Sequence, residues 1–411
     1  MRTLFVTWDG PGPNYMESLF LPIYDEIQKS ADVQFDVLQY CWDSDDRSAS
    51  IATAAERMSI PYVAGHVWRW PTLPATAMMI LKGALDIISY VRRHDVQVLM
   101  PRSIIPGAMC LLAIKFLPAV KLLYDADGLM ADERVDFGNW KPTGLMYRAF
   151  LKMELATIRR ADAVVTRTRN AKRILVERSG LAETADKMSV GSNGKDAEQF
   201  RPVTTTERTA IRKSINVNPD APLVIYCGSV GPQYYPAEML ALFGHILKLR
   251  PDACFIALTN EPDRFREHLA DHKFNNAQVQ CMRVEPDLVP RYLAAADLGL
   301  ALRKPSYSQK AVAPIKVGEY LLSGLPVVST RGIGDLDDQL DSDVGMFYEI
   351  DCDDSAQQIA DWFTDQVLSD RDAFCHNCRK RGLQFFGFDI SVQSYLTAFQ
   401  ILGSAGNDEI T

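Results

Sequence analysis

Short apolar runs alternate with longer amphipathic segments along the first half of the chain. Five runs have the length and β-branched character of buried strands, at residues 3–8, 33–40, 96–100, 121–124 and 163–166. Three longer segments repeat their apolar residues at three- and four-residue spacing, which predicts helices at 18–29, 75–93 and 145–160. Strands separated by helices are typical of a parallel, doubly wound α/β sheet.

The same alternation restarts after a polar segment that contains Pro202, Pro219 and Pro222. It predicts five further strands, at residues 223–227, 254–258, 278–284, 298–302 and 327–329. We therefore expect a second Rossmann-like sheet, with the domain boundary near residue 205. After residue 351 the pattern is only helical, and such a tail usually covers an existing surface.

Length and composition agree with two globular domains. A chain of 411 residues exceeds the size at which a single core stops growing, and 47% hydrophobic with 23% charged residues is ordinary for a folded protein. The net charge of −8 argues against generic nucleic-acid binding. The N-terminal sequence has no long apolar region of the signal-peptide type, so we expect the protein in the cytoplasm.

Three segments bear on membrane contact. The longest apolar stretch, 104–120, is interrupted by prolines and a lysine, which predicts a buried helix rather than a membrane span. The basic segment 141–178 is either a solvated helix face, which we favour, or a surface that contacts the inner face of an anionic membrane. A third segment contains His66, Trp68, Arg69 and Trp70. These residues form an aromatic edge that contacts the acceptor or the membrane, or the two tryptophans pack in the core.

The cysteines predict no metal site. The chain has eight, and only Cys375 and Cys378 have metal-like spacing, without a second pair to complete a zinc site.

Open parallel sheets bind ligands at the carboxyl ends of their strands, so the loops there are the first candidates for a site. In the loop after strand 3–8, glycines allow a close backbone approach, and the next helix offers amides to an anion or a sugar hydroxyl. A dinucleotide motif is not complete, because Tyr15 stands where the third glycine would be. The loop is a tight turn or an acceptor loop, and its candidate contacts are Gly10, Gly12, Asn14 and Tyr15.

A second loop, after strand 121–124, is rich in carboxylates. Ionised carboxylates accept strong hydrogen bonds from sugar hydroxyls, and a cluster of them also suits a divalent cation. A helix N-cap with neighbouring surface charges is the plain structural alternative. The candidates for catalysis are Asp125, Asp127 and Glu133, and Arg134 is a candidate acceptor contact.

The third loop follows strand 298–302 and leads into a helix that starts near Pro314. Free amides at the helix start and the side chain of Lys316 would stabilise a diphosphate, and Glu319 one turn later can accept hydrogen bonds from the vicinal hydroxyls of a ribose. The alternative is a surface ion pair between these two residues. The donor contacts that we predict here are Arg303, Lys310, Ile315, Lys316 and Glu319, and Lys316 is also a candidate for catalysis.

The third segment, PIKVGEYLLSGLPVV, resembles the donor-site signature P-x-K-x-x-E-Y-(small)-x-G-x-P-V-V of the retaining glycosyltransferases with the GT-B fold. These family 4-like enzymes include bacterial polysaccharide and lipopolysaccharide sugar transferases. Three further segments are similar to family motifs in the same order: VGSNGKDAEQFRP, VPRYLAAADLGLALR and FGFDISVQSYLTAF. The resemblance covers about residues 188–400.

The resemblance implies two Rossmann-like domains that face each other across a cleft. It implies an acceptor-binding domain at 1–204, a donor-binding domain at 205–385, and a C-terminal helix at 386–411 that crosses back to the first domain. Glu319 then matches the glutamate that binds the donor ribose, Lys316 the lysine near the diphosphate, and Gly228 with Ser229 the glycine-rich strand end.

The implied activity is hexosyl transfer from a UDP- or GDP-linked sugar to the hydroxyl of a glycan or lipid-linked glycan, with retention and without metal or other cofactor. Peripheral contact with the inner membrane surface would accompany a lipid-linked acceptor. Because the departing phosphates gain negative charge, preset cations and amides can lower the barrier without a protein nucleophile.

The chain also departs from the family pattern. Ala311 stands where many relatives have a first glutamate, and the Arg and Lys that usually follow the glycine-rich strand are absent from GSVGPQYYPAEM. Phosphate contacts are then expected from Arg303, Lys310 or Lys316. Two alternatives remain: a non-catalytic nucleotide-sugar-binding partner subunit, and a nucleotide-sugar epimerase on the same fold.

Overall fold

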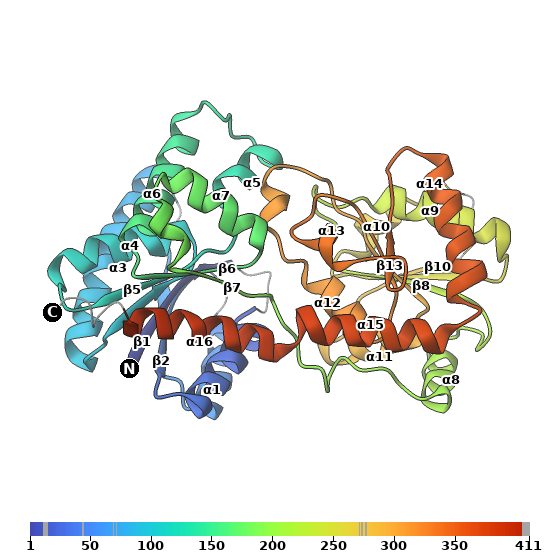
Figure 1. The fold of residues 1–411 in the computed structure, drawn as a ribbon, viewed down its shortest axis with the longest axis horizontal. Coiled ribbons are helices and arrows are strands. Elements are labelled where there is room, and N and C mark those ends of the chain that lie inside the picture. The colour runs from blue at the N-terminus through green and yellow to red at the C-terminus, as the bar shows by residue number, and fades with distance from the viewer. Residues whose placement is uncertain are drawn as a thin grey trace. The chain divides into compact units, whose positions relative to one another are not determined.

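The computed structural model describes residues 1–10, 15–42, 45–68, 70, 72–270, 272, 274–275 and 278–404. The chain forms two compact units (Figure 1). The first consists of Met1–Ser192 and Ser391–Thr411, and the second of Asn193–Ile390. The chain therefore passes from the first unit to the second after Ser192 and returns to the first unit at Ser391. The sequence predicted these boundaries near residues 205 and 386.

The first unit is built on a seven-stranded sheet with the order β3-β2-β1-β4-β5-β6-β7, in which every pair is parallel. Its strands are β1 (Arg2–Asp9), β2 (Gln34–Cys41), β3 (Tyr62–His66), β4 (Val98–Pro101), β5 (Lys121–Asp125), β6 (Ala163–Thr166) and β7 (Met188–Val190). The five strands predicted from apolar runs are confirmed. The pattern missed both edge strands, because β3 is half exposed and β7 is short and not buried along its whole length.

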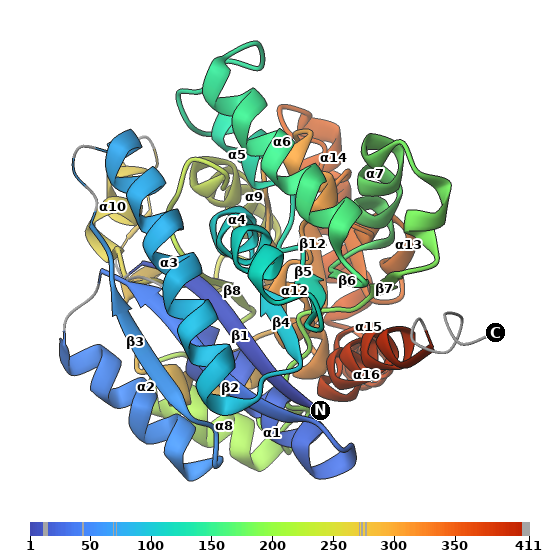
Figure 2. The same ribbon diagram turned by 90° about the vertical axis from the view of Figure 1, so that its left-hand side faces the viewer.

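Helices cover both faces of this sheet (Figures 1 and 2). They are α1 (Leu21–Ser30), α2 (Asp45–Arg57), α3 (Thr72–His94), α4 (Ile104–Ala113), α5 (Met130–Asp136), α6 (Leu145–Arg160), α7 (Arg169–Ser179) and α16 (Phe388–Ser404). The Tyr40 hydroxyl of β2 donates to Asp86 of α3 at 2.9 Å, whereas Phe35 of the same strand contacts Phe399 of α16. Since positions 35 and 40 point to opposite sides of a strand, α3 and α16 cover opposite faces.

The C-terminal helix α16 is fixed to the first unit by several contacts. Tyr395 donates a hydrogen bond to the buried Asp125 at 2.8 Å, and Lys121 Nζ donates to the carbonyl of Leu402 at 2.5 Å. Ser391 Oγ donates to the carbonyl of Ser192 at 2.5 Å. The expected return of the C-terminal helix to the N-terminal domain is confirmed.

Only one helix in the described part of the chain, α3, has the length and apolar composition that could span a membrane. A third of its most apolar window is buried, and Asp86 in the middle of the helix bonds to the sheet. This packing identifies α3 as a helix of the α/β layer. The stretch at 104–120, predicted as a buried helix, contains α4, which is largely buried.

The second unit has a six-stranded, fully parallel sheet with the order β10-β9-β8-β11-β12-β13. Its strands are β8 (Leu223–Cys227), β9 (Cys254–Leu258), β10 (Val279–Met282), β11 (Leu298–Ala301), β12 (Val327–Ser329) and β13 (Gly345–Phe347). Its helices are α8 (Thr205–Ser214), α9 (Pro236–Leu249), α10 (Pro262–Glu267), α11 (Val289–Ala295), α12 (Ile315–Leu322), α13 (Leu336–Gln339), α14 (Asp353–Trp362) and α15 (Arg371–Phe386). The five predicted strands are confirmed, and the three-residue β13 was missed.

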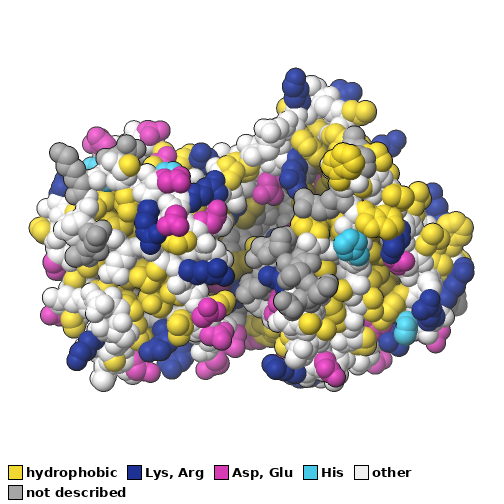
Figure 3. Space-filling view, turned by 180° about the vertical axis from the view of Figure 1, so that it is seen from behind, with side chains coloured by type: hydrophobic (Ala, Val, Ile, Leu, Met, Phe, Trp, Pro, Cys, Tyr) yellow, Lys and Arg dark blue, Asp and Glu magenta, His cyan; other side chains and the backbone are white. Residues whose placement is uncertain are grey.

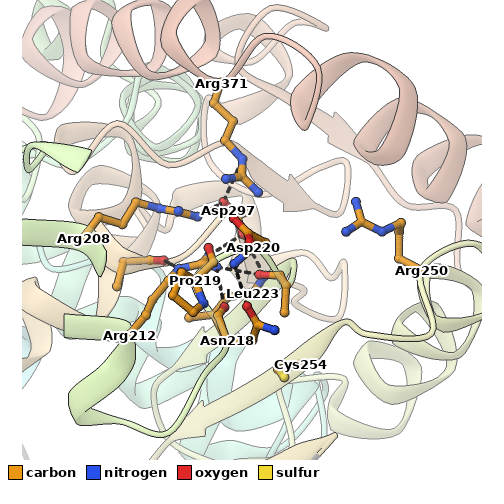
Figure 4. Close-up of polar contacts among 12 residues, drawn as sticks. Arg208, Arg212, Asn218, Pro219, Asp220, Leu223, Arg250, Cys254, Asp297 and Arg371 are labelled. Atoms are coloured by element: carbon orange, nitrogen blue, oxygen red, sulfur yellow. Dashed lines mark hydrogen bonds and ion pairs between the residues drawn. The ribbon is translucent and has the colours of Figure 1, made fainter. Parts of the chain in front are cut away.

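A buried charge cluster joins helices to the amino ends of β8 and β11 (Figure 4). The Asp297 carboxylate, just before β11, accepts hydrogen bonds from Arg208 of α8, from Arg212 Nη2 at 2.5 Å and from the Leu223 amide at 2.8 Å. Arg371 Nε, at the start of α15, lies 3.2 Å away. One carboxylate thus ties two helices and two strands together at the edge of the sheet opposite to the strands' carboxyl ends.

Candidate functional site

The candidate site of the second unit lies where β8 and β11 end. These strands are direct neighbours, so the loops that follow them meet at the carboxyl edge of the sheet. A single antiparallel bridge pairs Tyr234, after β8, with Arg303, after β11. The Lys304 amide also donates to the Gln233 carbonyl at 2.9 Å. The two loops therefore hold each other in place.

Gly228 directly follows β8 in a conformation that requires glycine. Its φ is +153°, and a Cβ placed there would lie 2.6 Å from Lys316 Nζ. The adjacent Ser229 is exposed, and its carbonyl accepts a hydrogen bond from the Tyr226 hydroxyl at 2.6 Å. The predicted glycine-rich strand end therefore lies directly beside the predicted lysine.

Lys316 lies in the first turn of α12, whose start carries no side-chain cap. Its Nζ contacts the Tyr226 hydroxyl at 3.2 Å and lies 4.1 Å from the ring centroid of Tyr234 and 4.4 Å from that of Tyr226. Desolvation lowers the pKa of Lys316, because burial disfavours the charged ammonium. An anion placed here would gain both the ammonium and the positive end of the helix.

Glu319 lies one turn farther along α12 and forms an ion pair with Lys195 at 3.4 Å. Burial raises the pKa of Glu319, and the ammonium of Lys195 opposes that shift. Both Glu319 and Lys316 act electrostatically on Cys227, the last residue of β8. The two residues predicted to bind the donor are therefore together at the end of one strand.

The remaining predicted donor contacts have different surroundings. Arg303 is 8% exposed, and it donates to Gln309 Oε1 at 2.6 Å and to the Tyr234 hydroxyl at 3.1 Å. Lys310 is exposed, with its Nζ 5.4 Å from the ring centroid of Tyr307. Ile315 is half-buried as the first residue of α12, and Ala311 is fully buried.

In the first unit the predicted catalytic residue Asp125 belongs to a buried polar network. Its side chain is fully buried and is held by Arg167 at 2.6 and 2.8 Å, Arg102 at 3.3 Å and the Tyr395 hydroxyl at 2.8 Å. Both carboxylate oxygens are occupied by protein donors. These partners and the full burial favour a structural role for Asp125, which joins α16 to the sheet, over the predicted catalytic role.

The two other predicted carboxylates after β5, Asp127 and Glu133, remain accessible. Asp127 is one-third exposed and pairs with Arg102, and desolvation raises its pKa against the attraction of that guanidinium. Glu133 and Arg134 are exposed on α5. These three residues lie at the carboxyl edge of the first sheet or on the helix that follows it.

The first predicted loop is described only in part, because Gly12 and Asn14 lie outside the described residues. Gly10 lies against Trp42, and a Cβ at this position would lie 2.6 Å from the indole ring, so close packing explains this glycine. Tyr15 is 41% exposed. Trp68 and Trp70 are exposed as well, which rules out core packing for them, while Arg69 lies outside the described residues.

Three contributors to the second unit's site were not predicted: Lys195, Tyr226 and Tyr234. Lys195 lies in the predicted interdomain motif, and both tyrosines flank the glycine-rich strand end. Tyrosines near a glycine turn do not by themselves indicate that they will contact the cations of a ligand site. Their roles depend on the meeting of three separate segments.

The described residues include no group of three or more His, Cys, Asp and Glu side chains that could hold a metal ion. Cys378 is buried and Cys375 half-buried on α15. The cations of the second unit's site are the protein's own Lys195, Arg303, Lys310 and Lys316.

Comparison with known proteins identifies related sequences and folds. Residues 207–384 match the model of the family "Glycosyl transferases group 1". No curated protein matches the chain by sequence.

Several solved structures are similar over nearly the whole chain. HepE of Anabaena in complex with UDP is 15% identical over 97% of this chain and 100% of its own, with a TM-score of 0.67. A glycosyltransferase from Rickettsia africae is 14% identical over 98% and 99%, with a TM-score of 0.74. A putative UDP-N-acetylglucosamine 2-epimerase from Listeria monocytogenes is 13% identical over 96% and 95%, with a TM-score of 0.55. At these identities the likeness establishes the GT-B fold.

Proposed function

We propose that the chain, whose residues 207–384 match the group 1 glycosyl transferases, transfers a hexose from a UDP- or GDP-linked sugar to a hydroxyl of a glycan or lipid-linked glycan. The transfer retains the anomeric configuration and needs no metal ion. The activity belongs to the synthesis of surface polysaccharides, at the cytoplasmic face of the membrane.

The observation that carries the donor part of this proposal is the position of Lys316 and Glu319. They lie one turn apart on α12, beside the glycine that follows β8. A diphosphate needs positive charge and a close backbone approach, and a ribose needs an acceptor for its hydroxyl groups. The site offers all three where the first turns of α12 lie beside the end of β8. The solved HepE structures contain UDP and UDP-glucose, which is consistent with a donor of this class.

The same side chains support a metal-independent mechanism. When the sugar–phosphate bond breaks, negative charge grows on the diphosphate, and preset cations stabilise the transition state more than the ground state. Lys316 and Arg303 have no carboxylate among their hydrogen-bond partners in the described structure, so their charge remains for the phosphates. Asp127 and Glu133 are the candidate contacts for the transferred sugar or the acceptor.

The first unit supports a lipid-linked acceptor through the outer face of α3. Met78, Leu81 and Leu85 are 50, 60 and 67% exposed along this helix, and Trp70, just before it, is 87% exposed. The spacing of the three helical residues forms one apolar stripe, which we call the α3 stripe. A stripe of this kind with a tryptophan at its end suits the interface between lipid headgroups and acyl chains.

Charge at the other end of α3 fits an anionic bilayer. Arg92, Arg93 and His94 occupy the last turn of the helix. Figure 3 shows hydrophobic side chains gathered on one face of the first unit, with Lys and Arg side chains around them. Basic residues beside an apolar stripe add electrostatic attraction to anionic lipid. The basic segment 141–178 contributes less, because Arg178 and Arg159 are bonded to Asp132 and to the Ser179 carbonyl.

Donor binding is tested by isothermal titration of UDP, GDP and ADP and their sugar conjugates, with and without EDTA. We expect one nucleotide to bind in both conditions. Glu319→Ala should weaken that binding at least about tenfold, since a hydrogen bond to a charged group contributes ~1.5–3 kcal/mol. The matched control is Glu267→Ala, an exposed glutamate of α10. Equal affinity in both variants would refute the ribose role of Glu319.

Product analysis separates transfer from the two alternatives. Consumption of the nucleotide-sugar only when an acceptor is present supports transfer, and NMR of the product gives its anomeric configuration. Isomerisation of the donor without any acceptor would establish the epimerase. Tight donor binding with no turnover over a panel of glycan and polyprenyl-linked acceptors would favour the non-catalytic subunit.

Vesicle flotation tests the membrane part. Binding to vesicles of phosphatidylcholine with phosphatidylglycerol should fall strongly in the double variant Leu81→Glu/Leu85→Glu. The control is Leu145→Glu, an exposed leucine at the start of the basic segment 141–178. Loss of binding only in the control would move the contact surface to that segment, and no binding by the unmodified protein would refute membrane contact.

A further inference from the structure

Tyr234 lies at the centre of the positive charges of the donor site. Its ring centroid is 4.1 Å from Lys316 Nζ and 4.9 Å from the guanidinium carbon of Arg303. Its hydroxyl accepts a hydrogen bond from Arg303 Nη1 at 3.1 Å. The backbone bridge to Arg303 and the hydrogen bond from its own amide to the Gly231 carbonyl fix its position. No other described side chain contacts both of these cations in this way.

The groups around Tyr234 come from three elements. Lys316 approaches from α12 and Arg303 from the loop after β11. On the β8 side lie Ser229 and Tyr226, whose own hydroxyl donates to the Ser229 carbonyl. The nearest carboxylates act on other groups: Glu319 pairs with Lys195, and Glu261 accepts from the Val230 amide at 3.2 Å. Tyr234 therefore faces two cations and no carboxylate.

We propose that the protonated hydroxyl of Tyr234 donates a hydrogen bond to the donor diphosphate, and that in the empty site at alkaline pH the same hydroxyl ionises and balances the charge of Lys316 and Arg303. This inference rests on the proposed donor site. It assigns to a tyrosine part of the phosphate contact that other family members make with a lysine or arginine after the glycine-rich strand. It also makes donor binding depend on the protonation of one phenol.

The electrostatics give the direction of that dependence. Desolvation opposes the ionisation of Tyr234, but Lys316 and Arg303 outweigh it and lower the pKa of the phenol to about 8. Burial raises the pKa of Tyr226 well above its ordinary value, so Tyr226 stays neutral. A diphosphate adds negative charge beside Tyr234, which disfavours the phenolate and raises its pKa in the complex.

The sign of the pH effect follows from this difference. A group whose pKa is higher in the complex contributes its full affinity below the pKa of the free protein, and this contribution is lost as the pH rises above it. Below pH 8 the phenol already holds its proton. Above pH 8 binding must take up one proton from solvent, and the affinity should fall about tenfold for each further pH unit.

The first measurement is isothermal titration of UDP and GDP at pH 7, 8 and 9, in pairs of buffers with different ionisation enthalpies. At pH 9 we expect uptake of close to one proton by the wild-type protein and about fivefold weaker binding than at pH 8, where half of the phenol is already ionised. Tyr234→Phe should bind about tenfold more weakly at pH 7, because it lacks the hydroxyl donor, and should lose most of the pH dependence. The matched control Tyr235→Phe, the adjacent tyrosine stacked under Lys304, should behave as wild type.

A spectroscopic measurement distinguishes Tyr234 from Lys316, whose deprotonation would also weaken binding. Tyrosinate absorbs near 295 nm, so the free protein should show one tyrosine that ionises near pH 8. This transition should be missing in Tyr234→Phe, present in Tyr235→Phe, and shifted to higher pH by saturating nucleotide.

The outcomes separate this inference from the donor site itself. If neither UDP nor GDP binds the wild-type protein at pH 7, the proposed donor site fails and this inference with it. If a nucleotide binds and Tyr234→Phe keeps the wild-type pH dependence, the titrating group is Lys316 and the role of Tyr234 is refuted. Absence of a tyrosine transition near pH 8 refutes it as well.

Discussion

Replacement of Asp297 by asparagine should be among the most destabilising single changes in the second unit. The substitution keeps the shape of the side chain but removes its charge. Arg212, which is fully buried, Arg208 and Arg371 would then lie close together without a counter-ion (Figure 4). Burial already lowers the pKa of Arg208 and of Arg212, with Asp297 opposing this shift. These guanidinium groups therefore depend on a single carboxylate.

The size of the effect follows from the burial of the cluster. Removal of one partner from a buried ion pair costs ~3–5 kcal/mol, because it leaves an uncompensated charge away from water. In a unit of this size, a loss of that magnitude lowers the midpoint of thermal unfolding by about 6–20 °C. The amide of Leu223 also loses its charged acceptor, so the effect should include the start of β8.

The assay is thermal and urea unfolding of the full chain, with hydrogen exchange to locate the loss of stability. Asp252→Asn is the matched control, since Asp252 is half exposed and pairs with Arg250 at 2.9 Å on the surface of the same unit. The control should cost no more than ~1 kcal/mol. Addition of Arg371→Gln to Asp297→Asn should recover part of the stability, because it removes one uncompensated charge. If Asp297→Asn and the control differ by less than about 1 kcal/mol, the reasoning about this cluster is wrong.

Three further predictions concern the sites. Lys316→Met should lower kcat about 100-fold with a smaller change in KM, measured as steady-state sugar transfer, because the ammonium acts mainly on the departing diphosphate; a change confined to KM would contradict this. Tyr395→Phe should destabilise the first unit by ~1–2 kcal/mol in urea unfolding through the lost hydrogen bond to Asp125, without loss of nucleotide binding. Gly228→Ala should weaken nucleotide binding at least about tenfold in a titration, since the new Cβ strains a φ of +153° and displaces Lys316, whereas wild-type affinity would show that neither constraint matters.

The sequence predicted the sheets well because their strands are buried on both faces. β8, β9 and β12 coincide with the predicted apolar runs to the residue. An apolar run is a local property of the sequence, so it can be recognised without knowledge of the tertiary structure. The half-exposed edge strand β3 lacks this signal, and so do β7 and β13, which are as short as β12 but, unlike it, are not buried along their whole length.

The site was predictable only where its residues are neighbours in sequence. Lys316 and Glu319 are one turn apart on a single helix, so their alignment follows from helix periodicity. Lys195 and Tyr234 reach the same place from loops far away in the sequence, and nothing local connects them. Asp125 was assigned to catalysis for the same reason: the sequence shows a carboxylate at a strand end but not Tyr395, which covers it from a position 270 residues later.

The partners of each charged side chain distinguish structural from functional charges in this protein. Asp125 and Asp297 are each surrounded by arginines. These ion pairs join helices to a sheet, and because the opposite charges neutralise each other, they leave no net charge to bind a ligand. Lys316 and Arg303 are contacted by phenols and an amide oxygen instead. Hydroxyl and aromatic partners orient a cation but stabilise its charge less than a carboxylate does. An incoming anion therefore still binds the cation favourably. A tyrosine next to such cations can also release its proton when no anion is present, which a carboxylate partner would prevent.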